Sequence, residues 1–319
     1  MHRITFECET ITPMFMAGAD GKTPELRAPS IKGALRFWWR ALNGHLELEE
    51  LKEREGEIFG NTEQRSKVLL RVREVDVIYS NTTFLASIGR KAHDIKYLAY
   101  GVEDHYYIEE GSRFEVVVSC KNYEIIEKHI KPAFSALVAF GGLGAKGRNG
   151  FGSIKASNVD DIDTVLRYSA FKQEIQARYT ALSSKVKVFE GVYSVRSWEV
   201  GISDLKFIYA DNGKKKIYPK KNRAYIAAPY PNVETPERHA KLFFMSFFEV
   251  KGEIYYRITF IPYQYLSGYP LGNKVSYDSI FKTWTQVIYD EGSGMNDNIY
   301  NSSDQDDFLL KKREHNDNH

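Results

Sequence analysis

The sequence contains little cysteine and no long apolar run. Its 319 residues include only two cysteines, Cys8 and Cys120, too few for a disulfide framework. Each lies on the apolar side of a strand-like alternation, so both are predicted to be small buried residues in a reduced compartment. No apolar segment is long enough to cross a membrane, and none has the pattern of a leader peptide. We therefore expect a cytoplasmic protein without membrane contact.

The net charge is close to zero, because 44 basic residues stand against 42 acidic ones. A general attraction to nucleic acid is therefore weak, and any such site has to come from local clustering. There is no histidine and cysteine spacing typical of structural zinc and no His-Glu-x-x-His motif, so we expect no metal and no cofactor. A length of 319 residues exceeds what one hydrophobic core usually supports and predicts two domains.

The most informative segment is the glycine-rich run over residues 140–152, FGGLGAKGRNGFG. Glycine lets backbone amides approach a ligand closely, and Lys146 and Arg148 add positive charge, so the run is suited to phosphate. The P-loop pattern fails because Lys146 is followed by glycine instead of serine or threonine. The dinucleotide pattern fails because these glycines follow a helix and precede a strand. The run therefore favours a polyanion, and a turn that only packs tightly is the alternative.

Hydrophobic periodicity divides the first half into strands and helices. Strands are predicted at 3–11, 68–79 and 113–120, with a closing strand to about residue 157. Helices are predicted at 30–42, with Ser30 as N-cap, at 47–58, and at 122–140, where Pro132 has to kink or split the helix. Residues 12–29 form a long loop of the kind that is usually functional, and 97–107 are predicted to be irregular with possible short strands. This order matches a ferredoxin-like domain over residues 1–157.

The second half has a less regular pattern. A helix is predicted at 161–182, strands at 192–200, 206–210, 240–250 and 253–262, and a final helix at 276–289; Lys251-Gly252 predicts a hairpin turn. The simplest interpretation is a second, degenerate α+β domain over 158–290, followed by a polar and flexible tail at 291–319. Six basic residues lie between Lys214 and Arg223, in a loop that is either simply solvated or in contact with phosphate.

The helix predicted at 30–42 carries three cations one turn apart, Lys32, Arg36 and Arg40, with Trp39 beside them. Such a stripe could follow a phosphate backbone, and an exposed tryptophan would offer a plate for base stacking. The alternative is that these cations pair with acidic residues of the following helix.

Residues 3–42 and 132–155 closely resemble the RAMP superfamily of CRISPR-associated proteins. Within it, they are most similar to the first-numbered subunits of Cmr (type III-B) effector complexes. The resemblance implies an α+β fold with two ferredoxin-like (RRM-like) domains in tandem, in which the glycine-rich loop follows the second helix of the first domain. It also implies a non-catalytic RNA-binding subunit of an antiviral complex, with guide RNA, target RNA and other Cmr subunits as partners.

The resemblance also assigns roles to individual residues of this chain. The glycine loop with Lys146 and Arg148 would grip the RNA backbone, Lys32, Arg36 and Arg40 would line the adjoining groove, and the loop around Asp20 and Arg27 would reach toward RNA or a neighbouring subunit. The residues expected at the RNA are Arg27, Lys32, Arg36, Trp39, Arg40, Gly141, Gly142, Gly144, Lys146, Arg148, Gly150 and Gly152. Whether they meet guide or target RNA stays open.

Some RAMP relatives cut RNA, through a histidine or through a loop aspartate with a divalent ion. His45 and Asp20 are the best-placed residues of each kind here. We expect neither to be catalytic. A RAMP endoribonuclease and a pure assembly subunit without RNA contact are the alternative functions.

Overall fold

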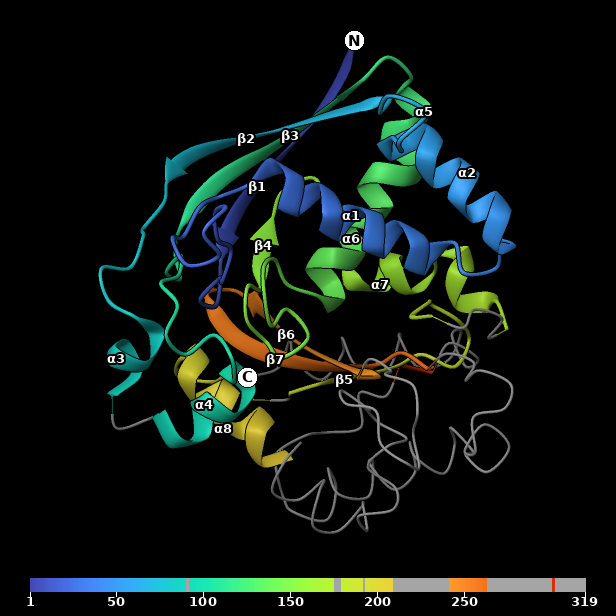
Figure 1. The fold of residues 1–319 in the computed structure, drawn as a ribbon. Helices are drawn as coiled ribbons and strands as arrows, with labels where there is room; N and C mark the ends of the chain where they lie inside the picture. Colours follow the sequence, from blue (N-terminus) through green and yellow to red (C-terminus); the bar gives the residue numbers. More distant parts are fainter. Residues whose placement is uncertain (90–91, 175–178, 192, 209–240, 263–299, 302–319) are drawn as a thin grey trace, which may run out of the picture.

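A computed structural model describes residues 1–89, 92–174, 179–191, 193–208, 241–262 and 300–301. It contains two four-stranded sheets whose strands pair antiparallel throughout (Figure 1). The strand orders are β2-β3-β1-β4 and β6-β7-β5-β8. When the strands of each sheet are numbered along the chain, both sheets have the order 2-3-1-4, which is that of the ferredoxin-like fold. The predicted fold class is confirmed.

The first sheet comprises β1 (His2–Thr10), β2 (Val68–Asp76), β3 (Arg113–Cys120) and β4 (Ile154–Ala156). Alternate residues of its two central strands point into the core, as period-two patterning predicts. Cys8 and Cys120 are among them, and both are buried free thiols, as expected.

The first helix, α1 (Ala28–Leu42), is followed by α2 (Leu48–Phe59). The predicted N-cap at Ser30 is wrong, because the helix begins at Ala28 with Arg27 in the N-cap position. Pro29 explains the earlier start, since its fixed φ and missing amide hydrogen suit the first turn of a helix.

The helix predicted at 122–140 is one continuous rod of three parts: α5 (Tyr123–Ile125), a π-helical turn η2 (Ile126–Ile130) and α6 (Lys131–Phe140). The π turn directly precedes Pro132 and accommodates a residue that donates no backbone hydrogen bond. The helix is therefore neither broken nor ended by its proline.

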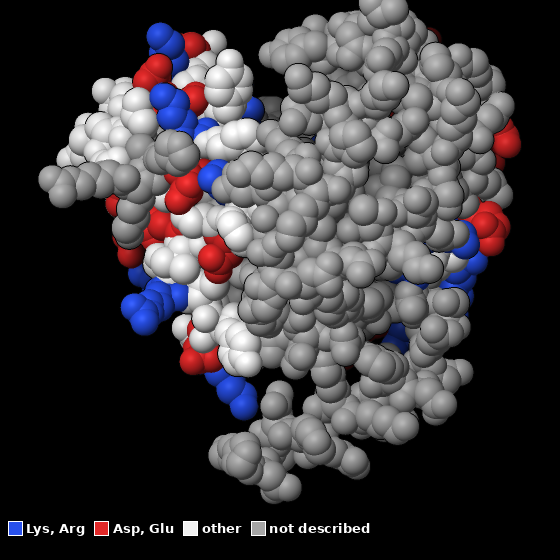
Figure 2. Space-filling model, turned by 90° about the horizontal axis from the view of Figure 1, so that it is seen from below, with Lys and Arg blue, Asp and Glu red and all other residues white. Residues whose placement is uncertain are grey.

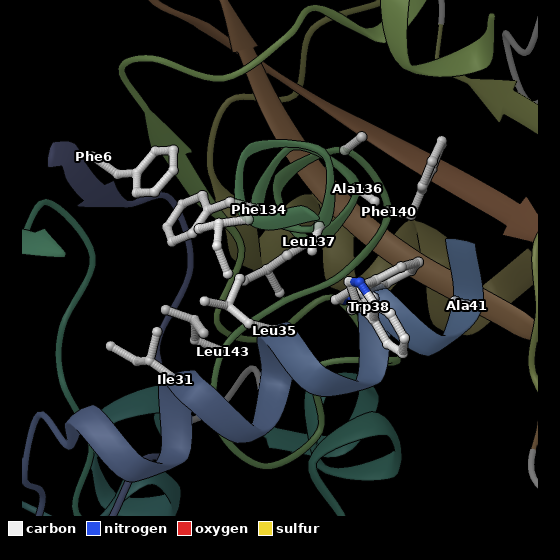
Figure 3. Packing of buried hydrophobic residues seen from close by; sticks show 14 of the residues in the cluster. Phe6, Ile31, Leu35, Trp38, Ala41, Phe134, Ala136, Leu137, Phe140 and Leu143 are labelled. Atoms are coloured by element: carbon white, nitrogen blue, oxygen red, sulfur yellow. The ribbon is translucent and has the colours of Figure 1, made fainter. Parts of the chain in front are cut away.

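Helix α6 is the centre of the molecule. Its sequence KPAFSALVAF is apolar nearly all round, and seven of its ten residues are buried. Figure 3 shows Phe134, Leu137 and Phe140 of α6 facing the α1 side chains Leu35 and Trp38. Phe134 also stacks on Phe6 of β1, with ring centroids 3.9 Å apart.

The second sheet comprises β5 (Lys187–Glu190), β6 (Phe243–Val250), β7 (Glu253–Phe260) and β8 (Tyr300–Asn301). It packs against α6 on the side away from the first sheet (Figure 1). The predicted hairpin between β6 and β7 is confirmed, with Lys251 and Gly252 at φ 53° and 83°. Positive φ at both central residues matches the twist of paired strands.

Several predictions for the second half are wrong. The helix at 161–182 reduces to α7 (Ile162–Leu166) and a short 3-10 turn, η3 (Ser169–Lys172). In place of strands at 192–200 and 206–210 the structure has α8 (Trp198–Lys206), whose buried residues follow helical spacing. In the first half, α4 (Ala92–Ala99) extends into the stretch at 97–107 expected to be irregular, and a short helix that was not predicted, α3 (Phe84–Ile88), precedes it.

Other predictions fall partly or wholly outside the described residues. The basic loop from Lys214 to Arg223 and the helix at 276–289 lie there. Within the predicted tail, Tyr300 and Asn301 pair with β5, so these two residues take part in the sheet. The two hydrophobic clusters each contain residues from both sides of position 157, and the domain division there stays a prediction.

A buried ion pair ties the second sheet to the end of α6. Arg257 of β7 donates from Nε to Glu190 Oε1 at 2.7 Å and from Nη1 to the carbonyl of Ala139. Its guanidinium also lies over the ring of Phe248, 4.4 Å from the centroid. Arg257 thus satisfies a carbonyl at the C-terminal end of α6, where a cation is favoured.

None of the helices in the described part of the chain combines the length and the apolar character needed to cross a bilayer.

Candidate nucleic-acid interface

The glycine-rich loop, defined here as residues 141–153, folds tightly upon itself and upon the segment after β1. The amides of Leu143 and Gly152 donate to the carbonyls of Gly152 and Pro13, and the amide of Ala145 donates to Phe15. A Cβ on Gly142 would lie 2.3 Å from the carbonyl oxygen of Phe151. The glycines thus permit close backbone packing, which was the alternative interpretation of this run.

Only the tip of the loop faces solvent. Gly144 and Ala145 are exposed, Lys146 and Gly147 are partly exposed, and no described residue accepts a hydrogen bond from the amides of Gly144, Lys146 or Gly147. Gly141, Gly150 and Gly152 are buried, so the expectation that they face a ligand is wrong. A phosphate could therefore meet main-chain donors of this loop at its tip.

Three cations from distant parts of the chain meet beside this tip: Lys146, Arg148 and Lys241. Arg148 donates to the carbonyl of Lys241 at 2.9 Å, and Lys241 donates to the Asn149 side chain at 2.6 Å. We call these three residues the loop cation cluster. Burial, followed by the charges of Arg148 and Lys146, lowers the pKa of Lys241 to about 7. The charges of Arg148 and Lys146 thus disfavour the protonated form of Lys241, as neighbouring like charges do.

Arg148 joins the loop to α1. Its guanidinium carbon lies 5.4 Å from the ring centroid of Phe37 and 4.5 Å from that of Phe244 on β6. These cation–π contacts hold the side chain between the opening helix and the second sheet. The glycine-rich loop thus contacts α1 at Phe37.

The three cations of α1 point toward α2 and the segment that follows it. Arg36 Nε and Arg40 Nη1 donate to Glu55 Oε1 at 2.6 and 2.8 Å, while Lys32 Nζ donates to Ser66 Oγ at 2.8 Å. Glu55 is almost fully buried, whereas the arginine side chains are 36% and 38% exposed. This is the acidic pairing that the sequence left open, and it lowers the net charge available to a polyanion on this face of α1.

Trp39 does not form a stacking plate. It is 1% exposed, donates from Nε1 to His129 Nδ1 at 3.2 Å and packs against Phe59. The expected exposure is therefore wrong, because the stripe that α1 buries includes both of its tryptophans. Burial lowers the pKa of His129, which keeps its ring neutral so that Nδ1 can accept this bond.

The loop around Asp20 is held by local hydrogen bonds. The Asp20 carboxylate accepts from the amides of Lys22 and Thr23 at 2.9 Å and from the Thr23 hydroxyl, and these bonds lower its pKa to about 2. Arg27 donates to the carbonyl of Ala17 at 3.3 Å and lies 3.7 Å from Glu25. A carboxylate with so low a pKa is a poor general base, and its main contribution here is to shape the turn.

The described residues do not bring a metal site together. No group of three histidine, cysteine, aspartate or glutamate side chains in that part of the chain is arranged to hold an ion. His45 is exposed just past α1.

The open face of the first sheet offers no aromatic platform for bases on its described strands. Its outward positions on the described strands include no aromatic residue, whereas RRM domains stack bases on aromatic side chains of the sheet. Ion pairs cover much of this face, among them Arg73 with Glu115 and Lys155 with Glu9. Figure 2 shows the molecule from below the view of Figure 1, and basic and acidic side chains are interspersed over the described part of that side too.

Sequence reasoning missed two members of this surface, Lys241 and Phe37. Lys241 is 93 residues from Arg148 and has no basic neighbour on either side in the sequence, so nothing local marks it. Phe37 lies between the cations of α1 and was passed over in favour of Trp39.

Two ferredoxin-like sheets packed on a shared helix, with a glycine-rich loop between that helix and a closing strand, define a tandem RAMP-type architecture. A family model described as the RAMP superfamily matches residues 7–155. Among curated proteins, the CRISPR system Cmr subunit Cmr1-2 of Pyrococcus furiosus is 32% identical over 182 residues, covering 49% of this chain and 95% of that protein. Subunit Cmr1-1 of the same organism is 35% identical over 162 residues, covering 47% of this chain and 46% of the relative. The chain belongs to the RAMP superfamily and, within it, to the group of the Cmr1 subunits.

Solved structures share the fold over most of the chain. The crystal structure of apo Cmr1 from Pyrococcus furiosus has a TM-score of 0.63 at 23% identity, covering 90% of this chain and 96% of that one. A subunit in the cryo-EM structure of type III-B Cmr-beta bound to cognate target RNA and AMPPnP has a TM-score of 0.61 at 12% identity, covering 90% and 98%.

Proposed function

We propose that this chain is a non-catalytic, RNA-binding subunit of a type III-B Cmr complex and that it meets RNA phosphates at the loop cation cluster. The observation that carries the proposal is the convergence of the partly exposed Lys146 and Arg148 with the desolvated ammonium of Lys241 beside the tip of the glycine-rich loop. Membership of the Cmr1 group supports the assignment to a Cmr complex. A subunit with a similar fold comes from a Cmr-beta complex that was bound to target RNA. Charge neutralisation by lysine and arginine is the sequence-independent part of RNA binding.

Replacing Lys146 by glutamine is expected to weaken binding of single-stranded RNA several-fold. Each phosphate contact that is lost reduces the slope of log affinity against log salt by about 0.7. Lys146 has no ion pair with a described residue, so its removal leaves no carboxylate of that part of the chain unpaired. Fluorescence anisotropy of labelled RNA across a salt titration measures both quantities.

The matched control is Lys52→Gln, which removes one exposed lysine from α2. It should leave the affinity and the slope unchanged. Equal slopes for the wild type and Lys146→Gln would rule out this residue as a phosphate contact, and an affinity independent of salt would reject RNA binding altogether.

RNA affinity at fixed salt is expected to be constant below about pH 7 and to fall as the pH rises above it. The pKa of Lys241 is lowered to about 7 in the free protein, and a bound phosphate raises it. Binding therefore takes up a proton, so affinity is highest below the free pKa and declines as pH rises through it. Lys241→Gln should flatten this profile, and an unchanged profile in that variant would exclude Lys241 as its source.

We expect the purified chain to leave labelled RNA intact with magnesium or manganese. Both oxygens of the Asp20 carboxylate already accept hydrogen bonds from Lys22 and Thr23, which argues against a loop-aspartate nuclease. Gel analysis after prolonged incubation checks this, with Asp20→Ala beside the wild type. Cleavage by the wild type that disappears in Asp20→Ala would assign an endoribonuclease instead.

A further inference from the structure

A hollow of about 920 Å³ opens at the far end of α1 from Phe37, where α1 and β2 begin and β3 ends. No residue of the glycine-rich loop lines it. Its walls are mainly apolar and include Ala28, Val68, Leu69, Leu70, Cys120 and Ile125. A cavity of this size is in the range that specific ligands occupy.

The rim of the hollow is positively charged. Lys32, Arg65, Lys67 and Lys121 line it, and none of the described aspartates or glutamates does. Arg65 and Lys121 are exposed and have no carboxylate partner among the described residues, while Lys67 lies 3.4 Å from Glu57 in a half-exposed pair. Burial, followed by the charge of Arg36, lowers the pKa of Lys32. The hollow therefore suits a ligand with an apolar body and negative charges around it.

The strand beside the hollow has a free edge. Within the described sheet β2 pairs only with β3, and it lies at the outer edge of the sheet (Figure 1). It is nine residues long, contains no proline and exposes Leu69 and Val75. Proteins usually cover, shorten, charge or bulge such an edge, because its unpaired backbone groups invite another strand. Charged side chains and a register shift between Glu74 and Asp76 protect the later part of β2, so the start of the strand is the accessible part. The hollow lies at the start of this edge, since Val68, Leu69 and Leu70 form part of its wall.

The chemistry of the hollow favours a peptide over RNA. Its lining contains no aromatic residue, so a nucleotide base would gain no stacking there. The side-chain oxygen of Asn122 already accepts a hydrogen bond from the amide of Glu124. The Ser66 hydroxyl already donates to main-chain carbonyls, so neither group is available to hydrogen-bond a base. A β-strand, in contrast, presents apolar and charged side chains on alternate faces, which matches an apolar wall with a basic rim.

We propose that the hollow and the adjoining edge of β2 bind an extended segment of a partner protein in which apolar residues alternate with aspartate or glutamate. The segment adds to the sheet as a strand next to β2. Its apolar side chains enter the hollow and its carboxylates pair with the rim. Main-chain pairing supplies affinity and the hollow supplies specificity, as in other cases of strand addition. This site is separate from the loop cation cluster and does not depend on RNA binding there.

The test uses the full chain and a short fluorescent peptide in which glutamate alternates with leucine and valine. Anisotropy measures its affinity, and methyl NMR reports whether Val68, Leu69, Leu70 and Ile125 shift on binding. Arg65→Glu combined with Lys121→Glu should weaken binding by about tenfold or more, because both side chains are on the rim and exposed. The control, Lys52→Glu with Lys251→Glu, makes the same change in net charge at exposed sites that do not line the hollow and should have little effect.

Each other outcome overturns the proposal. Absence of peptide binding does so, as does binding that the rim variant and the control weaken equally. If single-stranded RNA shifts these methyl groups and the peptide does not, the hollow is a nucleic-acid site. If the chain alone associates with itself in sedimentation, and the rim variant abolishes this, the occupant is a second copy.

Discussion

The Arg257→Met variant is expected to lose about 3–5 kcal/mol of unfolding free energy, because it leaves Glu190 buried without its counter-charge. The side chains of this pair are only 5% and 11% exposed. The variant also removes the donor to the carbonyl of Ala139, which leaves the end of α6 with one bond fewer. Denaturant unfolding followed by circular dichroism and tryptophan fluorescence measures the loss.

The Arg73→Ala variant is the matched control. It removes an arginine that pairs with Glu115 on the open face of the first sheet, where the arginine side chain is 69% exposed. Exposed ion pairs contribute about 1 kcal/mol or less. Similar losses for Arg257→Met and Arg73→Ala would mean that the buried pair does not connect the second sheet to α6 as described. Replacing both partners, with Arg257→Met and Glu190→Leu, should recover much of the loss.

The second large effect is expected from Gly152→Ala, with a loss of about 3–5 kcal/mol. Gly152 has φ +67°, and an added Cβ would lie 1.9 Å from the carbonyl oxygen of Leu143. That contact cannot be relieved by a side-chain movement, since the amide of Leu143 donates to Gly152 and fixes the two backbones together. Thermal unfolding and denaturant titration both report the change.

Gly33→Ala provides the comparison within the same protein. Gly33 is an exposed residue inside α1, and an added Cβ there meets nothing within 4 Å. Alanine is the better helix former, so this variant should gain about 0.5–1 kcal/mol. If Gly152→Ala proved as harmless as Gly33→Ala, the close packing of the glycine-rich loop would be wrong.

Much of the first sheet could be predicted because its signals are local. The alternation around Phe6 and Phe114 marks half-buried strands, and both strands are present. The order of strands and helices was enough to indicate the ferredoxin-like fold. Pro132 was anticipated as a disturbance, but its accommodation by a π turn depends on how tightly the rod packs between two sheets.

The candidate site was harder to predict because burial and pairing depend on tertiary structure. Helical spacing places Trp39 next to the cations of α1, and only the packing of Phe59 and His129 shows that it faces inward. The sequence indicated that Arg36 either contacts phosphate or pairs with an acidic residue of the following helix. Helical spacing alone could not decide between the two, and the structure shows the pair with Glu55. The segment around Trp198 was predicted to be a strand because it is short and contains β-forming residues. It is the helix α8, and its residues Trp198, Ile202 and Leu205 pack in the second hydrophobic cluster.

The residues of the loop cation cluster come from two segments that are far apart in the sequence, so the ribosome synthesises them at different times. Lys146 and Arg148 emerge with the first half of the chain, but Lys241 follows only after more than ninety further codons. Arg148 is held partly by Phe244 and by the carbonyl of Lys241, so its final position also waits for β6. A nascent or prematurely terminated polypeptide therefore lacks the complete cluster, and the proposed phosphate contact requires translation products that extend through β6.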